Sequence, residues 1–469
     1  MEGTSSMNNK ANPVSYRNII RLAIPIVLSS LSATVMSIVD RGFASSFDIT
    51  QFSSIMTSAT YANTVAGIFT GIISYMVYYV SQYYGSESYE NCAKIFWQSI
   101  YLSIVFSIVL LLIVPIAAPI FKWLGHSTEV VVYEKEYFFY VLSAGCVNLF
   151  VLSITNLFKG VSKVGVVFTV GVLSNIVNVF LDWLLIFGNM NMPELGAITG
   201  GGIATLSSNI FALVALVFYL SFNKEYWKPY RILQNRTLNL KTIGQILRYS
   251  IPTSIHNFVR MAYYSICLLI ISIAGEIGIS SANIVFTIES ISILPVTGIV
   301  TAISIIATQE KGANRSENIG KVLKKGVFLI LSINVIIMVL YIFFPSGLII
   351  LFNNIKEPDR FKQISDIAKP LIRIMALWIS MDSIHLVISN TLRALGDTKF
   401  FMMVSIISPP LFYIVIPLIC VQNSISIIWI WWGLLLFTVV IFVSAILRYL
   451  GGRWKHIEII AKEENIIVE

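Results

Sequence analysis

Charged side chains are scarce in this sequence. Asp, Glu, Lys and Arg make up 12% of the 469 residues, whereas hydrophobic residues make up 56%. A soluble domain carries roughly 25% charged residues. A soluble chain of this length would need a large charged surface, so we expect most of the surface to face lipid. The formal net charge is +8, but the charges lie in short connections between apolar runs, which argues against a nucleic-acid partner.

Motifs for metal binding, nucleotide binding and catalysis are also missing. The cysteines, Cys92, Cys146, Cys267 and Cys420, form no CxxC pair, so we expect buried thiols, no disulfide framework, no metal and no cofactor. No GxxxxGK[ST] or HExxH sequence occurs, and we therefore expect neither an ATPase nor another enzyme. Active transport would have to use an ion gradient. The polar residues 1–18 contain no apolar core of a cleavable signal peptide.

Long apolar runs are what the sequence has instead. A membrane-spanning helix needs about 20 mostly apolar residues. The sequence therefore predicts an all-α polytopic membrane protein embedded in a lipid bilayer, with about twelve transmembrane helices. The runs are residues 20–44, 53–81, 95–119, 132–154, 164–187, 197–221, 244–273, 279–308, 324–345, 367–391, 400–422 and 426–448.

Basic residues gather in every second connection between these runs. The longest connection, about 222–243, contributes Lys224, Lys228, Arg231, Arg236 and Lys241. The exception on the opposite side is the segment 356–373, which mixes basic residues with Glu357, Asp359 and Asp366. Because cytoplasmic loops are enriched in Lys and Arg, we expect both termini in the cytoplasm of a cell whose plasma membrane holds the protein.

The chain contains an internal repeat. AIPIVLSSLS at Ala23–Ser32 resembles SIPTSIHNFV at Ser250–Val259, and Pro25 and Gln82 correspond to Pro252 and Gln309. Both offsets are 227 residues (252 − 25 and 309 − 82). Duplication of a six-span unit predicts two lobes, 1–222 and 244–469, related by a pseudo-two-fold axis and joined by a cytoplasmic linker, 223–243. Such folds bind substrate near the midplane between halves that rock.

Two stretches carry a family resemblance. NIVNVFLDWLLIFGNMNMPELGAITGGGIAT, Asn175–Thr205, and MDSIHLVISNTLRALGDTK, Met381–Lys399, resemble corresponding motifs of the multidrug and toxic compound extrusion (MATE) family, in its bacterial branch. The resemblance covers about residues 20–450. It implies a two-lobed antiporter in which H+ or Na+ influx drives efflux of organic cations and drugs.

In the predicted N-lobe, two carboxyl groups lie within spans. Asp40 is expected midway along the first span and Asp182 midway along the fifth. Asn175, Asn178 and Asp182 have i, i+3, i+7 spacing, so they share one helix face that can hydrogen-bond Asp40. A carboxyl buried in a membrane can exchange a proton because burial disfavours its charged form. The resemblance also matches Asp40 and Asp182 to the family's proton-responsive positions, while the alternative is that they only hold the helices together.

The predicted C-lobe has a charge cluster of its own. Asp382 matches the acidic cation ligand that the resemblance implies for some relatives, but Arg260 stands where those relatives have a partner Glu. We expect Arg260 to lie within reach of Asp382, Glu289 or both, since an unpaired Arg is expensive in a membrane. An internal cation at this position argues against a Na+ site in this lobe. Alternatively, Arg260 binds an anionic or zwitterionic cargo.

Other polar residues are assigned structural or cavity-lining roles. His256 and His385 are interpreted as hydrogen-bonded structural residues, and Gly200–Gly202 as a point of close helix packing. Some tyrosines are expected to line a cavity, where flat cations can make cation–π contacts. The candidates are Tyr61, Tyr75, Tyr78, Tyr263 and Tyr264.

The sequence thus predicts a monomeric antiporter that exports small cationic amphipathic compounds in exchange for H+, or less favourably Na+, by rocker-switch alternating access. The first alternative is a flippase for lipid-linked saccharides, which would need a cavity rich in Arg and Lys. The second is an exporter of an anionic or zwitterionic metabolite that binds Arg260.

Overall fold

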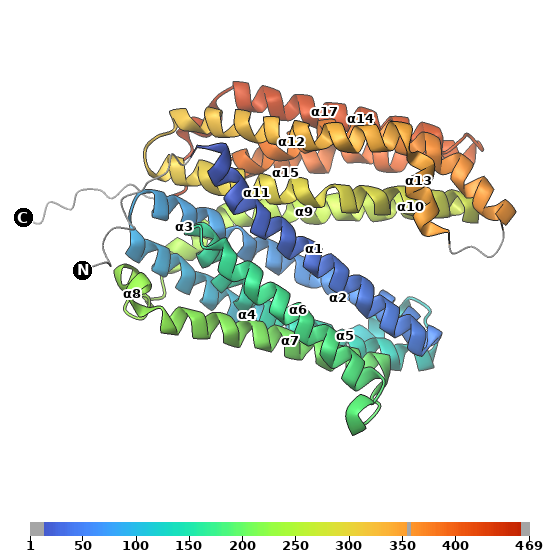
Figure 1. The fold of residues 1–469 in the computed structure, drawn as a ribbon, viewed down its shortest axis with the longest axis horizontal. Helices are drawn as coiled ribbons and strands as arrows, with labels where there is room; N and C mark the ends of the chain where they lie inside the picture. Colours follow the sequence, from blue (N-terminus) through green and yellow to red (C-terminus); the bar gives the residue numbers. More distant parts are fainter. Residues whose placement is uncertain (1–13, 354–357, 461–469) are drawn as a thin grey trace, which may run out of the picture. The chain divides into compact units, whose positions relative to one another are not determined.

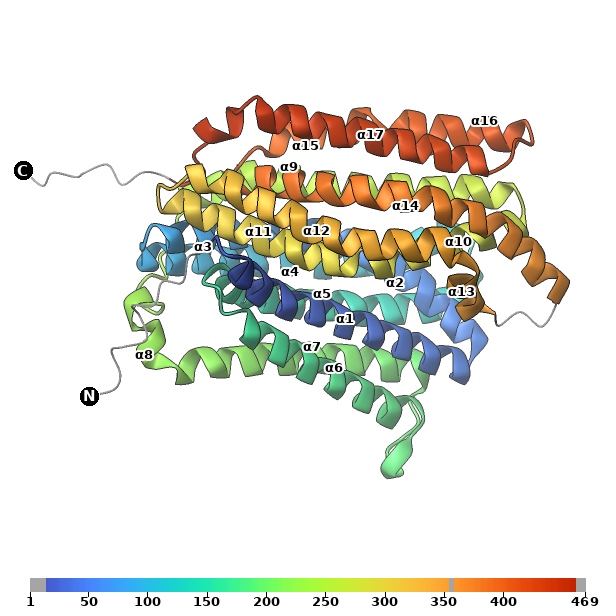
Figure 2. The ribbon, with the colours of Figure 1, turned by 45° about the horizontal axis from the view of Figure 1, so that its top comes forward.

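The computed structural model describes residues 14–353 and 358–460, which form helices joined by turns and short connections, with no β-strand among them. Most helices in Figures 1 and 2 are long and run in nearly parallel or antiparallel directions within their own bundle. Lys356 and Glu357, in the predicted outer segment, lie outside the described residues. The rest of that segment begins a helix at Pro358, so Arg360 and Asp366 lie on a helix and not in an extended connection.

The number of membrane-spanning helices agrees with the sequence. Eleven helices of the described chain are long and apolar enough to cross a membrane, and a twelfth span results if one bent pair counts as one. That pair is Glu276–Ser292 and Leu294–Gly312, bent by 41°. Pro295 stands in the first turn after the bend, where a proline ring is tolerated but a straight helix through it is not. The prediction of an all-α protein with about twelve spans is confirmed.

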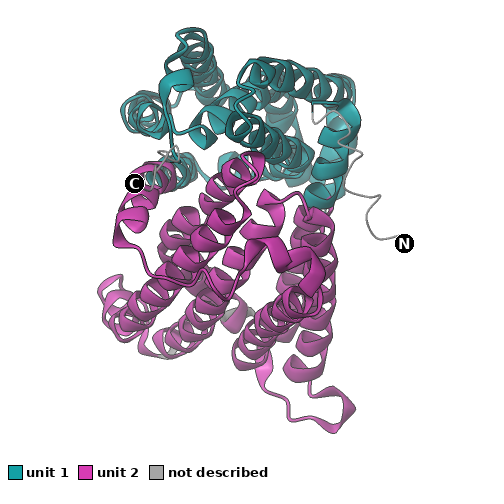
Figure 3. Ribbon diagram, turned by 90° about the vertical axis from the view of Figure 1, so that its left-hand side faces the viewer, with its two compact units in different colours: residues 1–27, 255–469 teal, residues 28–254 magenta. Residues whose placement is uncertain are grey.

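The chain forms two compact units, coloured separately in Figure 3. The N-unit is Leu28–Ser254, and the C-unit is residues 1–27 together with 255–469. The helices of the first half are α1 (Tyr16–Phe47), α2 (Ile49–Ser74), α3 (Met76–Gly85), α4 (Tyr89–Trp123), α5 (Thr128–Gly160), α6 (Val164–Ile186), η1 (Asn189–Asn191), α7 (Gly196–Phe222), α8 (Lys224–Trp227) and η2 (Lys228–Tyr230).

The second half begins with the long helix α9. Its elements are α9 (Leu240–Ile273), α10 (Glu276–Ser292), α11 (Leu294–Gly312), α12 (Glu317–Phe343), α13 (Pro345–Ile349), η3 (Ile350–Phe352), α14 (Pro358–Ala394), α15 (Thr398–Ile407), the π-helix η4 (Pro410–Val415), α16 (Ile416–Gln422), α17 (Ile428–Leu450) and η5 (Arg453–His456).

One long helix forms the centre of each unit. In the N-unit, α5 packs against α2, α3, α4 and α7, and in the C-unit, α14 packs against α10, α11, α12 and α17. These two are the fourth span of the first half and the fourth of the second, as expected for a repeat. Because α14 is surrounded, it can hold polar side chains away from lipid, and Asp382, Ser383 and His385 are all buried.

The first helix of each half is divided between the units. Helix α1 passes from the C-unit to the N-unit after Val27, and α9 passes from the N-unit to the C-unit after Ser254. These positions are 227 residues apart (254 − 27), which is the repeat offset found in the sequence. Each follows a helix-interior proline, Pro25 or Pro252, by two residues.

Two glycines let these helix segments pack closely within their units. A Cβ on Gly71 would come within 2.6 Å of the Ser254 hydroxyl, and a Cβ on Gly298 within 2.3 Å of Val27. Gly71 and Gly298 are again 227 residues apart (298 − 71). Ser254 also donates a 2.6 Å hydrogen bond to the Ile68 carbonyl of α2. The repeat is therefore visible in equivalent packing contacts and not only in sequence.

The connection between the halves is folded along α4. Trp97 donates to the Ile232 carbonyl at 2.6 Å, and Gln98 donates to the Thr237 carbonyl at 2.9 Å. The predicted lobes, 1–222 and 244–469 with the linker 223–243, were defined by the repeat. The compact units are defined by packing and place the early parts of α1 and α9 differently, so those sequence boundaries stay a prediction.

The glycine and cysteine assignments agree with the structure. A Cβ on Gly200 would lie 2.9 Å from the Leu185 backbone carbon, which confirms close packing of α7 on α6. The four cysteines are free and buried. Two basic residues, Arg393 and Lys311, are buried at helix ends, where protein oxygens compensate their charge. Arg393 bonds Asn257 and Asn390, and Lys311 bonds the carbonyls of Trp454 and Ile457.

Candidate functional site

The N-unit site is formed where α1 and α6 end. Asp40 lies seven residues before the end of α1 at Phe47, and Asp182 four residues before the end of α6 at Ile186. The expectation that both lie midway along their helices is therefore wrong. Helix α1 begins at Tyr16 and α6 at Val164, so most of each helix precedes its carboxyl residue. The two helices nevertheless present their carboxyl groups to each other.

The two carboxyl groups are close enough to share a hydrogen bond. As carboxylates they have no proton to donate, and Oδ1 of Asp40 and both side-chain oxygens of Asp182 are buried without a hydrogen-bond partner among the described residues. One proton on the pair would supply the missing donor. Two like charges in contact disfavour double ionisation, so this geometry favours a pair that holds one proton.

Polar neighbours surround the carboxyl pair on one side. Asn178 is buried next to Asp182 on α6, and neither atom of its amide has a partner among the described residues. Asn175, one turn earlier, donates to the Ser32 hydroxyl of α1 at 2.8 Å. Tyr137 of α5 is near enough to interact electrostatically with both carboxyls. The structure thus brings the four predicted residues of this lobe to the α1–α6 contact.

Apolar side chains close the same end of the N-unit. A hydrophobic cluster contains Ala44, Ile55, Ile186, Ala197 and Ile198, with Phe43, Phe47, Tyr137 and Phe187 packed against it. These residues come from the ends of α1 and α6, the starts of α2 and α7, and, for Tyr137, the first part of α5. The carboxyl pair therefore lies beside a packed apolar layer, where an uncompensated charge is costly.

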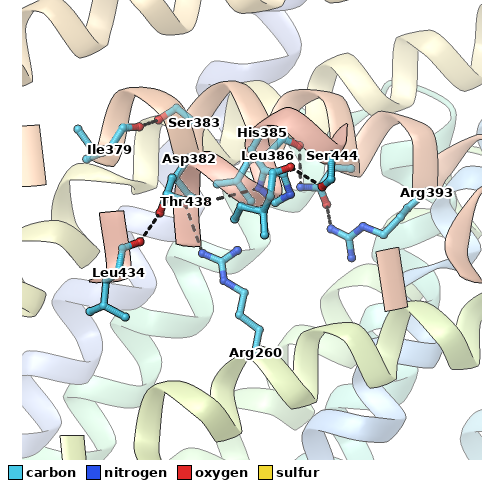
Figure 4. A network of polar contacts seen from close by, with 12 residues as sticks. Arg260, Ile379, Asp382, Ser383, His385, Leu386, Arg393, Leu434, Thr438 and Ser444 are labelled. Carbon is cyan, nitrogen blue, oxygen red and sulfur yellow. Dashed lines mark hydrogen bonds and ion pairs between the residues drawn. The ribbon is translucent and has the colours of Figure 1, made fainter. Parts of the chain in front are cut away.

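The C-unit site confirms the predicted ion pair. Nη2 of Arg260, on α9, lies 3.5 Å from Oδ2 of Asp382, on α14. The Asp382 side chain is 4% exposed, whereas that of Arg260 is 49% exposed. Asp382 is therefore enclosed by the helices, while half of the Arg260 surface is uncovered by protein. Figure 4 shows the guanidinium reaching from α9 toward the carboxylate.

Both histidines assigned structural roles also belong to this site. Nδ1 of His385 lies 3.6 Å from Oδ1 of Asp382, one turn away on the same helix. Nδ1 of His256 lies 3.1 Å from the Phe401 carbonyl, a contact that fits the structural interpretation. Asp382 thus has Arg260 at one oxygen and His385 near the other.

These groups line a cavity within the C-unit. Its walls are mostly aromatic and apolar, with His256, Arg260, Asp382 and His385 as the titratable side chains apart from tyrosines. The remaining lining residues are Tyr263, Trp378, Phe401, Val404, Ser405, Pro409, Tyr413, Phe437, Thr438 and Ile441.

Only some of the tyrosines predicted to line a cavity are found in the walls of this one. Tyr263 lines it, whereas Tyr264 packs edge-on against Phe286, and Tyr75 is a buried core residue. The sequence analysis missed Trp378 and Tyr413 as wall residues. Trp378 had a usable signal, because it precedes Asp382 by four residues and so shares its helix face.

Glu289 lies near the ion pair without replacing Asp382 as the partner of Arg260. It interacts electrostatically with Arg260 and Asp382, but its carboxylate forms no ion pair within 4.0 Å among the described residues. The described residues also contain no group of three or more His, Cys, Asp or Glu side chains arranged to hold a metal.

The repeat reappears in the comparison with protein families. The MatE family profile matches two segments, residues 25–184 and 252–419, which begin at Pro25 and Pro252 and together cover more than half of the chain. The chain belongs to the MatE family. This MATE chain is therefore a multi-pass membrane protein from a family of transporters.

Relatives of this MATE protein extend over nearly its whole length. It is 23% identical over 456 residues to a protein named "Probable multidrug resistance protein NorM" of Thermotoga maritima, with 96% of both chains covered. It is 22% identical over 398 residues to "Multidrug resistance protein MdtK" of Yersinia pestis, covering 82% of this chain and 83% of the relative.

Solved structures show the same fold. A multidrug resistance MATE family transporter of the MOP superfamily, described in an outward-facing conformation, aligns with a TM-score of 0.83 at 17% identity. The alignment covers 94% of this chain and 96% of that structure. At this identity the likeness shows that the two proteins share a fold.

Proposed function

We propose that this MATE protein exports small amphipathic organic compounds, of the cationic class found among drugs, in exchange for H+. The observation that carries the proposal is the contact between Asp40 and Asp182 at the ends of α1 and α6. The neighbouring side chains are neutral amides and a phenol, apart from the adjacent and exposed Arg41. A pair that gains and loses one proton changes the net charge of the N-unit site by one.

The coupling cycle follows from this charge change. With one proton, the carboxyl groups hydrogen-bond each other and hold α1 against α6. Without it, two carboxylates repel and must separate or gain contact with water. We propose that this switch biases a rocker-switch change of access, so that proton entry resets the protein after cargo release. The chain would act as a monomer in the plasma membrane with both termini cytoplasmic.

Na+ is a weaker candidate for the coupling ion. The C-unit carboxylate Asp382 already has the Arg260 guanidinium at 3.5 Å, so a cation entering there would meet a like charge. A lipid-linked saccharide flippase is also disfavoured, because Arg260 is the one Arg or Lys among the described residues that line the cavity.

Reconstituted protein tests the proposal. Proteoliposomes loaded with ethidium would be given either a pH gradient or a Na+ gradient of equal size. We expect ethidium movement under the pH gradient alone, and loss of that movement in an Asp40→Asn variant. Movement that follows only the Na+ gradient would overturn H+ coupling, and no movement under either gradient would overturn cation export.

A further inference from the structure

The C-unit contains two Arg–Asp pairs in which the carboxylate is buried, and the two pairs have different geometries. Arg448 of α17 contacts Asp397 through Nε at 2.6 Å and Nη2 at 2.8 Å, and its guanidinium lies 4.6 Å from the Phe400 ring centroid. This is the bidentate geometry of a strong, fixed pair. Arg260, by contrast, reaches Asp382 through Nη2 alone, at 3.5 Å.

The loose pair faces a cavity, and the tight pair does not line it. Arg260 and Asp382 both line the C-unit cavity, and half of the Arg260 side-chain surface is uncovered. No hydrogen bond from Nε or Nη1 of Arg260 to protein is recorded among the described residues. A guanidinium has five N–H donors arranged to match a carboxylate, so most of this capacity is available to a ligand.

Charge balance limits what that ligand can be. An organic cation that takes Asp382 would leave Arg260 without its counter-ion, and an organic anion that takes Arg260 would leave Asp382 buried without one. Leaving the buried Asp382 unpaired is strongly unfavourable, whereas the half-exposed Arg260 loses less when its partner leaves. A molecule with both charges avoids each penalty, because its carboxylate replaces Asp382 at Arg260 while its ammonium replaces Arg260 at Asp382.

We propose that the C-unit cavity binds zwitterionic amphipaths by opening the Arg260–Asp382 pair and exchanging partners with it. With the pair closed, the cavity has a volume of about 40 Å³, so a ring-bearing molecule needs the room that opening of the pair provides. Trp378, Phe437 and Tyr413 present aromatic surface for a flat ring, and rings also stabilise an ammonium through cation–π contact. His385, 3.6 Å from the other oxygen of Asp382, keeps a hydrogen-bonding group beside the carboxylate during the exchange.

This inference rests on the proposed export function and adds to its cationic cargo a preferred class, compounds that also carry a carboxylate. The test measures binding to the purified full-length protein in lipid nanodiscs by calorimetry at neutral pH. It compares three probes that carry the same aromatic ring and differ in their charged groups. The probes are 2-naphthylalanine as zwitterion, 2-(2-naphthyl)ethylamine as cation and 3-(2-naphthyl)propionate as anion.

We expect the unmodified protein to bind the zwitterion at least about 10-fold more tightly than either singly charged probe, as bidentate carboxylate recognition by Arg would give. Arg260→Gln should abolish this preference and increase affinity for the amine, because Asp382 is then free. Arg236→Gln, in the exposed linker, is the matched control and should leave all three affinities unchanged.

Three results would overturn the inference: equal binding of zwitterion and amine by the unmodified protein, an unchanged preference in Arg260→Gln, or no measurable binding of any probe. Should Arg260→Gln fail to fold, Asp382→Asn provides the second variant and should lose amine and zwitterion affinity together. An Asp40→Asn variant should keep the zwitterion preference while losing proton-driven export, so failure of the coupling proposal would leave this result standing.

Discussion

At the scale of single residues, substitutions of Asp by Asn in the N-unit carboxyl pair separate the effect of proton exchange from the effect of side-chain shape. Asn has nearly the outline and hydrogen-bonding reach of Asp but cannot exchange a proton. We therefore expect Asp40→Asn and Asp182→Asn each to reduce export driven by a pH gradient to the level of empty liposomes, with little change in melting temperature. Transport in proteoliposomes and thermal unfolding of the same preparations would measure both effects.

Glu90→Gln is the control for this pair of substitutions. Glu90 forms an exposed ion pair with Arg231 at 3.2 Å, so its loss removes a carboxylate without touching the α1–α6 contact. Export at the unmodified rate in either Asn variant would show that the carboxyl groups only join the helices.

The bidentate pair of Arg448 and Asp397 leads to a stability prediction. Arg448→Gln leaves Asp397 buried without its cation, which typically destabilises a protein by about 3–5 kcal/mol. We expect a clear fall in the midpoint of thermal unfolding in detergent. The exposed substitution Arg231→Gln, which breaks the pair with Glu90, should cost no more than about 1 kcal/mol. Equal effects of the two substitutions would show that burial does not strengthen the Arg448 pair.

Single residues also show how far sequence reasoning reaches in the sites. Arg260 and Asp382 could be paired in advance because each charge in an apolar run needs a partner. The distance between the two side chains and the half-exposed state of the guanidinium could not be predicted, because both depend on how α9 and α14 pack. The burial of Arg393 has the same origin, because its amide partners Asn257 and Asn390 are polar residues that hydropathy does not connect to it.

At the scale of helices, the close approaches at Gly71 and Gly298 can be tested against a neighbouring glycine. We expect Gly71→Ala and Gly298→Ala each to destabilise the protein by about 1–3 kcal/mol, because the added Cβ meets Ser254 or Val27 at less than contact distance. Gly67→Ala lies one turn from Gly71 on α2 with nothing within 4 Å. It should be neutral or stabilising by up to about 1 kcal/mol, as Ala favours a helix over Gly.

Melting temperatures of the three alanine variants in one detergent would decide the question. A Gly71→Ala protein as stable as Gly67→Ala would mean that α9 can move away from α2 at no cost.

Helix positions were predictable, but helix interruptions were only partly so. The apolar runs located the spans because a bilayer imposes a length and composition on each. One interruption lies at Ile293, two residues before Pro295. The pair Pro409–Pro410 instead continues as the π-helix η4, and the break between α2 and α3 at Tyr75 has no proline or glycine at all. Such details depend on neighbouring helices that can satisfy the freed backbone groups.

At the scale of the whole molecule, the buried cysteines allow a direct test of orientation. All four are buried, so a thiol reagent should react chiefly with a cysteine placed at an exposed position. We expect Asn191→Cys, in η1, to be labelled on intact cells by a membrane-impermeant maleimide. Lys224→Cys, at the start of α8, should be labelled only after the membrane is opened. The reverse pattern would place both termini outside.

The division of α1 and α9 between the units has a consequence for how such a protein came into being. Each six-span copy contributes a half-helix arm to the unit formed by the other copy, at positions separated by the repeat offset. Two ancestral subunits with this arrangement would have been an arm-exchanged dimer, obligatory for folding and dependent on subunit concentration. Fusion of two such subunits would make the exchange intramolecular. Fragments cut between α8 and α9 would each still lack one arm, and we expect them to fold only when produced together in the same membrane.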